Sequence, residues 1–123
     1  MAKQSILVID DSSEMLTLQK AILEQDGFDV FTAQGGADAL NVLSQIEDPS
    51  LILLDMQMED MSGLDFLSKL EKEKPEILEH VPVVFLSGME PPPASKAVGY
   101  IQKFPDIDIF LAYPKIQTLG LAN

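Results

Sequence analysis

Apolar residues in this chain form short unbroken runs that alternate with segments of helical spacing. Residues 5–9 (SILVI), 51–54 (LILL) and 81–86 (VPVVFL) are branched and apolar without polar alternation. Such runs are typical of parallel strands that are covered on both faces. Alternation over residues 28–32 predicts another strand, and residues 100–102 predict a fifth.

Helical patterns fill the intervals between these runs. Ser12-Ser13 would cap a first helix that ends near Gly27, Gly35-Gly36 opens a second, and Ser62 would cap a third that Pro75 closes. The expected apolar stripes are Met15, Leu18 and Ile22, with Leu16 and Leu23 beside them; Ala39, Leu40, Leu43 and Ile46; and Leu64, Leu67 and Leu70. Alternating strands and helices with short links predict an α/β fold, a doubly wound five-stranded parallel sheet with right-handed crossovers.

Length and composition are those of one globular domain. The chain has 123 residues, 46% of them hydrophobic, so we expect a single domain over residues 1–123 with no output domain after it. There is no cysteine, no apolar run long enough to span a membrane, and no secretion signal, which makes the cytoplasm the expected location. A net charge of −12, with lysine as the only strongly basic residue type, argues against binding nucleic acid.

Chemically distinctive side chains follow the predicted strands. Asp10 and Asp11 follow the first strand, Asp55 ends the third, Ser87 ends the fourth and Lys103 follows the fifth. Ligands of open parallel sheets bind at the carboxyl ends of the strands, so we expect these five residues to converge there. Neighbouring carboxylates repel one another and require a cation, for which Mg²⁺, with its preference for oxygen ligands, is suited.

Acids, a divalent ion, a lysine and a hydroxyl together suit phosphoryl transfer, which depends mainly on positioning the phosphoryl group and neutralising its oxygens. In this interpretation the carboxylate of Asp55 is the nucleophile that accepts the phosphoryl group. Ser87 and Lys103 would hold the added oxygens.

Four blocks of sequence resemble the receiver domain of two-component response regulators. They are VIDDS at 8–12, LLDMQMEDMSG at 53–63, VVFLSG at 83–88 and GYIQK at 99–103. The resemblance implies a flavodoxin-like sheet of order 2-1-3-4-5 and phosphorylation of Asp55 by a histidine kinase. It also implies Mg²⁺ bound by Asp10, Asp11, Asp55 and the backbone carbonyl of Gln57, a switch hydroxyl at Ser87, and a switch aromatic at Tyr100, although Tyr100 equally fits ordinary strand packing.

The chain departs from the family pattern at several places. Glu59 stands where proline usually follows the phosphoacceptor, and Phe104 separates Lys103 from Pro105, so the loop that aims the lysine differs. Residues 88–99 are too few for the usual loop and full fourth helix and include three consecutive prolines, so we expect that helix to be shortened or missing. Pro114 makes the last helix atypical.

The leading functional hypothesis is a phosphoacceptor receiver that takes its phosphoryl group from a sensor histidine kinase or phosphotransfer protein. It would signal to a downstream protein by altered docking, and would catalyse only its own phosphorylation and dephosphorylation, so it is not expected to be an ordinary enzyme. The alternative is a degenerate receiver that acts as an interaction module independent of phosphate, suggested by Glu59 and the proline segment. An aspartyl phosphatase of the haloacid dehalogenase type is disfavoured, because it needs a second aspartate where this chain has Gln57.

Overall fold

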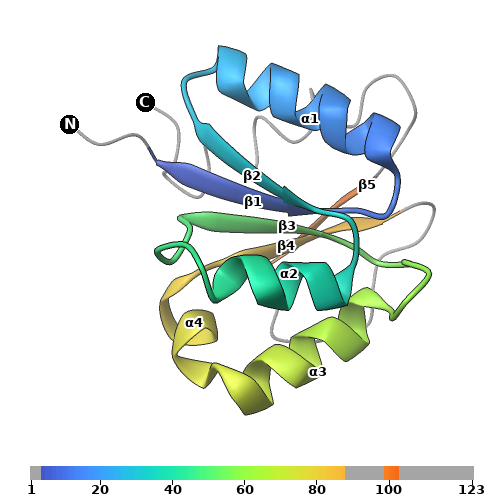
Figure 1. Cartoon of the computed structure of the whole chain (residues 1–123), viewed down its shortest axis with the longest axis vertical. Coiled ribbons are helices and arrows are strands. Elements are labelled where there is room, and N and C mark those ends of the chain that lie inside the picture. Colours follow the sequence, from blue (N-terminus) through green and yellow to red (C-terminus); the bar gives the residue numbers. More distant parts are fainter. Residues whose placement is uncertain (1–3, 88–98, 103–123) are drawn as a thin grey trace.

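The chain forms a five-stranded sheet with α1 on one face and α2, α3 and α4 on the other (Figure 1). The structure is a computed structural model that describes residues 4–87 and 99–102, with side chains described for 4–86. Its elements are β1 (Ser5–Ile9), α1 (Ser13–Gln25), β2 (Asp29–Ala33), α2 (Gly36–Leu43), β3 (Leu51–Asp55), α3 (Gly63–Glu73), α4 (Pro75–His80), β4 (Val83–Ser87) and β5 (Gly99–Gln102).

The strands are parallel and follow the order β2-β1-β3-β4-β5, which confirms the predicted flavodoxin-like topology. The register pairs Ile9 of β1 with Ala33 of β2 on one side and with Leu54 of β3 on the other. Asp55 is paired with Leu86 of β4. The carboxyl ends of these four strands are therefore level, which brings the residues after them to one edge.

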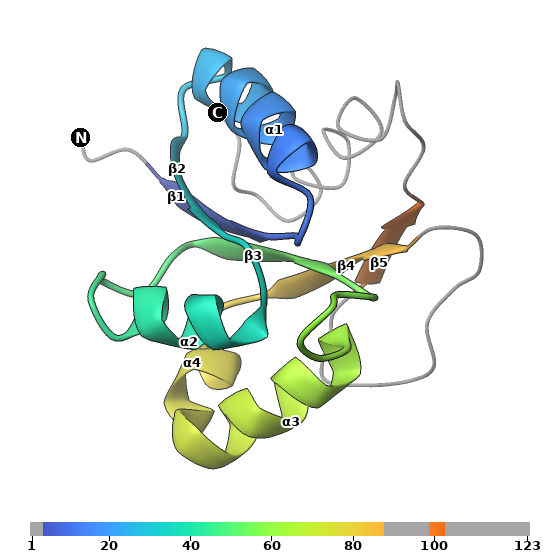
Figure 2. The ribbon, with the colours of Figure 1, turned by 45° about the vertical axis from the view of Figure 1, so that its right-hand side comes forward.

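Two apolar clusters lie on opposite faces of the sheet, which explains why the strands lack polar alternation. Even-numbered β1 residues Ile6 and Val8 pack with α1, whereas Leu7 and Ile9 pack toward α2, α3 and α4. Figure 2 shows the sheet between these two layers. Helices cover both faces of the sheet, so every side chain of the central strand β3 is buried. The strands therefore need the continuous apolar runs that the sequence shows.

Helix α1 packs with a different stripe from the one expected. Ser12 caps it as predicted, its Oγ accepting a hydrogen bond from the Met15 N–H at 3.3 Å. The buried residues are Leu16, Gln19 and Leu23, however, while Leu18 is 40% exposed. The buried face is therefore centred one residue away from Met15, Leu18 and Ile22, on a line that includes the expected neighbours Leu16 and Leu23. Ile22 is partly buried against the same cluster.

The end of α2 and the segment after α3 also differ from the prediction. Helix α2 stops at Leu43 rather than near Ile46, and the Ser44 hydroxyl donates to the Asn41 carbonyl oxygen at 2.6 Å in its last turn. Helix α3 ends before Pro75 as expected, but Pro75 then begins α4, because a proline is well accommodated in the first turn of a helix. Helix α4 is an element that the sequence interpretation missed.

The expectations for the fourth and last helices of the family fold concern residues 88–98 and 103–123, which lie outside the described residues. Among the helices of the described ranges, none combines the length and apolar character needed to cross a membrane.

Gln19 provides a test of the packing of α1. Its side chain is 1% exposed, and neither its amide oxygen nor its amide nitrogen has a hydrogen-bond partner among the described residues. An unsatisfied buried amide costs about 1–3 kcal/mol. We predict that Gln19→Met, which keeps the length of the side chain and removes the polar atoms, raises the free energy of unfolding by roughly 1 kcal/mol in urea denaturation. The control is Gln25→Met at an exposed position of the same helix, which should change the free energy of unfolding by less than about 0.5 kcal/mol. A loss of stability in Gln19→Met would contradict the inference that the Gln19 amide is buried without a hydrogen-bond partner.

Candidate functional site

Three carboxylates meet at the carboxyl edge of β1 and β3. Asp10 and Asp11 follow β1, Asp55 is the last residue of β3, and one oxygen from each lies within 4.8 Å of the others. Asp10 is fully buried and Asp55 is 7% exposed, while Asp11 is exposed. The structure therefore brings together three of the predicted metal ligands.

Backbone N–H groups hold each of these carboxylates in place. Asp10 Oδ1 accepts from the Ser12 N–H at 2.9 Å, and Asp55 Oδ1 accepts from the Gln57 N–H at 3.4 Å. Asp11 Oδ2 accepts from the Glu59 N–H at 3.0 Å. Repulsion between two ionised carboxylates at such separations is on the order of 3 kcal/mol at an effective dielectric near 20. Hydrogen bonds relieve part of this repulsion, and a bound cation would relieve more.

The loop from Met56 to Ser62 folds back on itself beside the acids. Gln57 and Ser62 form an isolated antiparallel bridge, and the Gly63 N–H donates to the Met56 carbonyl at 2.8 Å. A Cβ on Gly63 would lie 2.6 Å from the Asp55 carbonyl oxygen, so a glycine is needed where α3 begins against β3. Met58 and Met61 pack against the apolar cluster between the sheet and helices α2, α3 and α4. This packing anchors the loop, while Asp55 stays at the edge of the sheet with Asp10 and Asp11.

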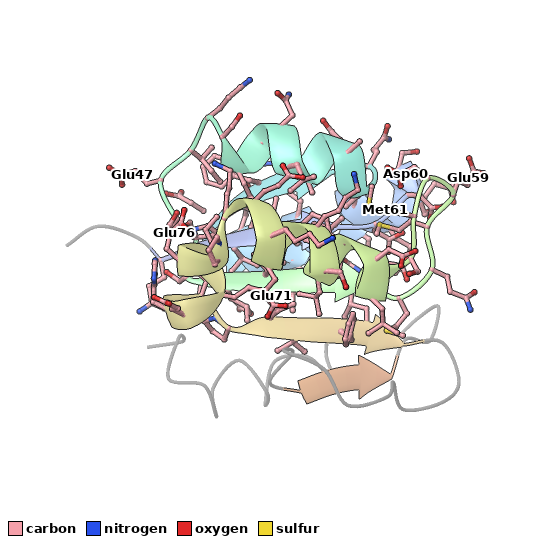
Figure 3. The ribbon with its side chains drawn as sticks, turned by 90° about the horizontal axis from the view of Figure 1, so that it is seen from below. Glu47, Glu59, Asp60, Met61, Glu71 and Glu76 are labelled. Carbon is pink, nitrogen blue, oxygen red and sulfur yellow. The ribbon has the colours of Figure 1, made fainter. Side chains whose placement is uncertain are left out.

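Asp60 connects this loop to α2. Its Oδ2 accepts from the Ala37 N–H at 2.9 Å and its Oδ1 from the Gly36 N–H at 3.2 Å, in the first turn of α2. These hydrogen bonds, chiefly that from Ala37, hold the pKa of Asp60 below its usual value, although burial acts in the opposite direction. Figure 3 shows Asp60 with Glu59 and Met61 at the end of the molecule where α2 begins.

The remaining predicted site residues are described only in part or not at all. Ser87 ends β4, next to β3, and Tyr100 pairs with Phe85 in the register of β5, but the side chains of Ser87 and Tyr100 lie outside the described residues. Lys103 lies outside them entirely. Their proposed roles therefore stay predictions.

Sequence reasoning missed Asp60. A signal was present at Gly35-Gly36, since a helix that opens on two glycines has no side chain of its own to accept its first N–H groups. Local reading cannot name the residue that supplies this acceptor, because Asp60 is 24 residues from Gly36.

A family model described as the response regulator receiver domain matches residues 6–104 of the chain. The chain belongs to the response regulator receiver domain family. Among curated proteins, this receiver is 37% identical over 82 residues to a transcriptional regulatory protein CpxR homolog of Haemophilus influenzae, covering 67% of the chain and 33% of that protein. It is 36% identical over 89 residues to a protein-glutamate methylesterase/protein-glutamine glutaminase of Caulobacter vibrioides, covering 71% of the chain and 24% of that protein. The match thus spans a third or less of these relatives.

Solved structures share the receiver fold. The chemotaxis protein CheY4 of Vibrio cholerae superposes with a TM-score of 0.81 at 22% identity, covering 96% of this chain and 99% of that one. The response regulator TrrA of Thermotoga maritima, in complex with Mg²⁺ and beryllofluoride, gives a TM-score of 0.70 at 26% identity, covering 94% and 98%. These likenesses confirm the fold predicted from the alternating strands and helices.

The lowered pKa of Asp60 makes a prediction about pH. A carboxylate whose pKa is lower in the folded than in the unfolded state adds stability above the unfolded value, near 4, and loses it as the pH falls through the folded value. We expect Asp60→Ala to lower the free energy of unfolding by about 1 kcal/mol at pH 6 relative to the unmodified chain. This difference should shrink as the pH falls below 4. Urea denaturation across pH 3–6 measures it; Glu47→Ala, at the opposite end of the molecule (Figure 3), is the control, and a difference independent of pH would contradict the role of the charge.

Proposed function

We propose that this receiver accepts a phosphoryl group on Asp55. The observation that supports the proposal is the grouping of Asp10, Asp11 and Asp55 within 4.8 Å at the carboxyl edge of the sheet. Asp55 is nearly buried and ends a strand paired with β1 and β4, so its position is set by the core. A fixed, partly desolvated carboxylate beside other acids suits a nucleophile that works with a metal ion.

In the proposed reaction, a carboxylate oxygen of Asp55 attacks the phosphorus of a phosphohistidine on a sensor kinase or phosphotransfer protein. The new bond is P–O and the bond that breaks is P–N. The imidazole nitrogen keeps the electron pair and is protonated, and Asp55 becomes an acyl phosphate. Hydrolysis ends the signal: water attacks the phosphorus, the bond between phosphorus and the Asp55 oxygen breaks, the carboxylate is restored and inorganic phosphate is released. No other substrate is turned over, so the receiver would not be an enzyme in the ordinary sense.

The donor set fits Mg²⁺. Asp10, Asp11 and Asp55 each offer a carboxylate oxygen, and the backbone carbonyl of Gln57, in the adjacent loop, is the proposed fourth ligand. All four are hard oxygen donors, as Mg²⁺ prefers, and the related TrrA was solved with Mg²⁺ and beryllofluoride. When bound, the ion would neutralise charge on the transferred oxygens and orient them.

Ser87 and Lys103 complete the proposal as the groups that would hold the phosphoryl oxygens. Tyr100 is proposed to report the change to a downstream protein. The added charge of roughly −1.5 to −2 at the acidic edge would supply the free energy for that change.

Phosphorylation of Asp55 can be tested directly. Incubation with Mg²⁺ and acetyl phosphate should add the mass of one phosphoryl group to the intact chain, while Asp55→Asn or removal of Mg²⁺ with EDTA should abolish the gain. Asp65→Asn, which removes an exposed charge from the first turn of α3, is the control and should react normally. No mass gain and no beryllofluoride binding in the unmodified chain would instead favour the interaction module that works without phosphate.

Glu59 allows a test of charge at the site. Its N–H contacts Asp11, and its side chain, which is exposed, lines the same hollow as Asp11. Glu59→Gln keeps the backbone contact and removes a negative charge, so at saturating Mg²⁺ we expect it to bind beryllofluoride about two- to fivefold more tightly. Titration followed by NMR measures this, with Glu47→Gln as the distant control. Weaker binding in Glu59→Gln would show that the side chain assists the anion.

A further inference from the structure

Helix α2 begins without a cap from its own sequence. Gly35 occupies the N-cap position and supplies no side-chain hydrogen bond. The first N–H groups of a helix need acceptors, and a carboxylate there also interacts favourably with the helix dipole. Asp60 meets this need from the β3–α3 loop by accepting from Gly36 and Ala37.

The two glycines make room for this contact. A Cβ on Gly35 would lie 2.8 Å from Asp60 Oδ1, and a Cβ on Gly36 would lie 2.6 Å from Met61 Cγ. A larger residue at Gly35 would displace the Asp60 carboxylate, and one at Gly36 would displace the Met61 side chain. The close approach of the loop to α2 therefore depends on Gly35 and Gly36 on the helix side and on Asp60 and Met61 on the loop side.

The same loop also contacts two candidate metal ligands. Glu59, adjacent to Asp60, donates its N–H to Asp11 Oδ2 at 3.0 Å, and Gln57 donates its N–H to Asp55 Oδ1 at 3.4 Å. Residues 57–60 therefore touch two carboxylates of the acidic group at one end and the first turn of α2 at the other. A shift of this segment would change both contacts together.

From this arrangement we infer that Asp60 is a positioning residue, which ties the β3–α3 loop to α2 so that Mg²⁺ binding at Asp10, Asp11 and Asp55 and the order of the first turn of α2 are coupled. The inference rests on the proposed function, since it takes the acidic group to be a Mg²⁺ site. Asp60 lies outside the group of Asp10, Asp11 and Asp55, so it would act through the loop. By linkage, the coupling is reciprocal: what loosens the α2 contact weakens Mg²⁺ binding, and Mg²⁺ protects the α2 contact.

Asp38 offers a matched control. It is an exposed acid in the first turn of α2, lines the same hollow as Asp60, and accepts a hydrogen bond from the Gln34 N–H at 3.1 Å. Asp38→Asn thus removes the same charge from the same hollow. It leaves the contact between the loop and α2 untouched.

The experiment is an NMR titration of the full chain with Mg²⁺, combined with amide hydrogen exchange. We expect Asp60→Asn to raise the Mg²⁺ dissociation constant about three- to tenfold, and Asp38→Asn to change it less than twofold. In the unmodified chain, Mg²⁺ should slow exchange of the Gly36 and Ala37 amides, and in Asp60→Asn this slowing should be lost. A purely structural cap would leave the exchange of these amides independent of Mg²⁺.

The outcomes separate the two proposals. If the unmodified chain binds no Mg²⁺, the proposed function and the coupling both fail. If it binds Mg²⁺ but Asp60→Asn matches Asp38→Asn in affinity, the coupling fails and the phosphoacceptor role stands. Exchange of Gly36 and Ala37 in the unmodified chain needs no substitution, so a variant that fails to fold leaves a decisive measurement: exchange unaffected by Mg²⁺ overturns the coupling.

Discussion

Repulsion among three carboxylates held at one edge of a parallel sheet is the constraint on which the site depends. Asp10 follows β1 and Asp55 ends β3, two strands that are paired in register through Ile9 and Leu54, and both acids are buried or nearly so. They cannot relax by moving apart without breaking the sheet or its two apolar clusters. The apolar core therefore keeps the acids together. Hydrogen bonds balance part of their charge, and in our proposal a cation would balance the rest.

The loop after Asp55 departs from the family pattern next to these carboxylates. Receiver domains usually have proline at the position of Glu59, and a proline has no N–H to donate. Here the Glu59 N–H contacts Asp11, so the substitution places a backbone donor on a candidate metal ligand. Gly63 fixes the end of the loop by its close approach to Asp55 of β3. Met61 fixes the middle of the loop by packing against the apolar cluster on the α2, α3 and α4 side of the sheet. Rigidity that a proline ring would give is replaced by contacts with the neighbouring elements.

Much of this organisation could be predicted from the sequence, because the signals were local. Unbroken apolar runs located the strands, and Ser12 and Ser62 located two helix starts. The carboxyl ends of parallel strands lie at one edge of a sheet, which predicted that Asp10, Asp11 and Asp55 lie together. Features that depend on tertiary contacts were missed. The buried face of α1 includes Gln19 rather than Leu18, since the position of the sheet and not hydrophobicity decided it. The cap that Asp60 provides for α2 was missed because capping residues are ordinarily sought within a few residues of the helix start, and Asp60 is 24 residues from Gly36.

The two kinds of feature also differ in what they would do in signalling. Strand ends held by the core make a rigid platform, which suits metal binding and phosphoryl acceptance but cannot itself transmit a change. The segment of Glu59 and Asp60 is joined to its neighbours by hydrogen bonds to Asp11, Gly36 and Ala37, and it is more easily displaced than a strand because each net contribution is only about 1 kcal/mol. Charge added at Asp55 acts on neighbours within several ångströms, and the segment carrying Glu59 and Asp60 is acidic and touches the site. In our proposal, phosphorylation would therefore displace this loop more readily than the sheet, and the displacement would reach the first turn of α2 through Asp60.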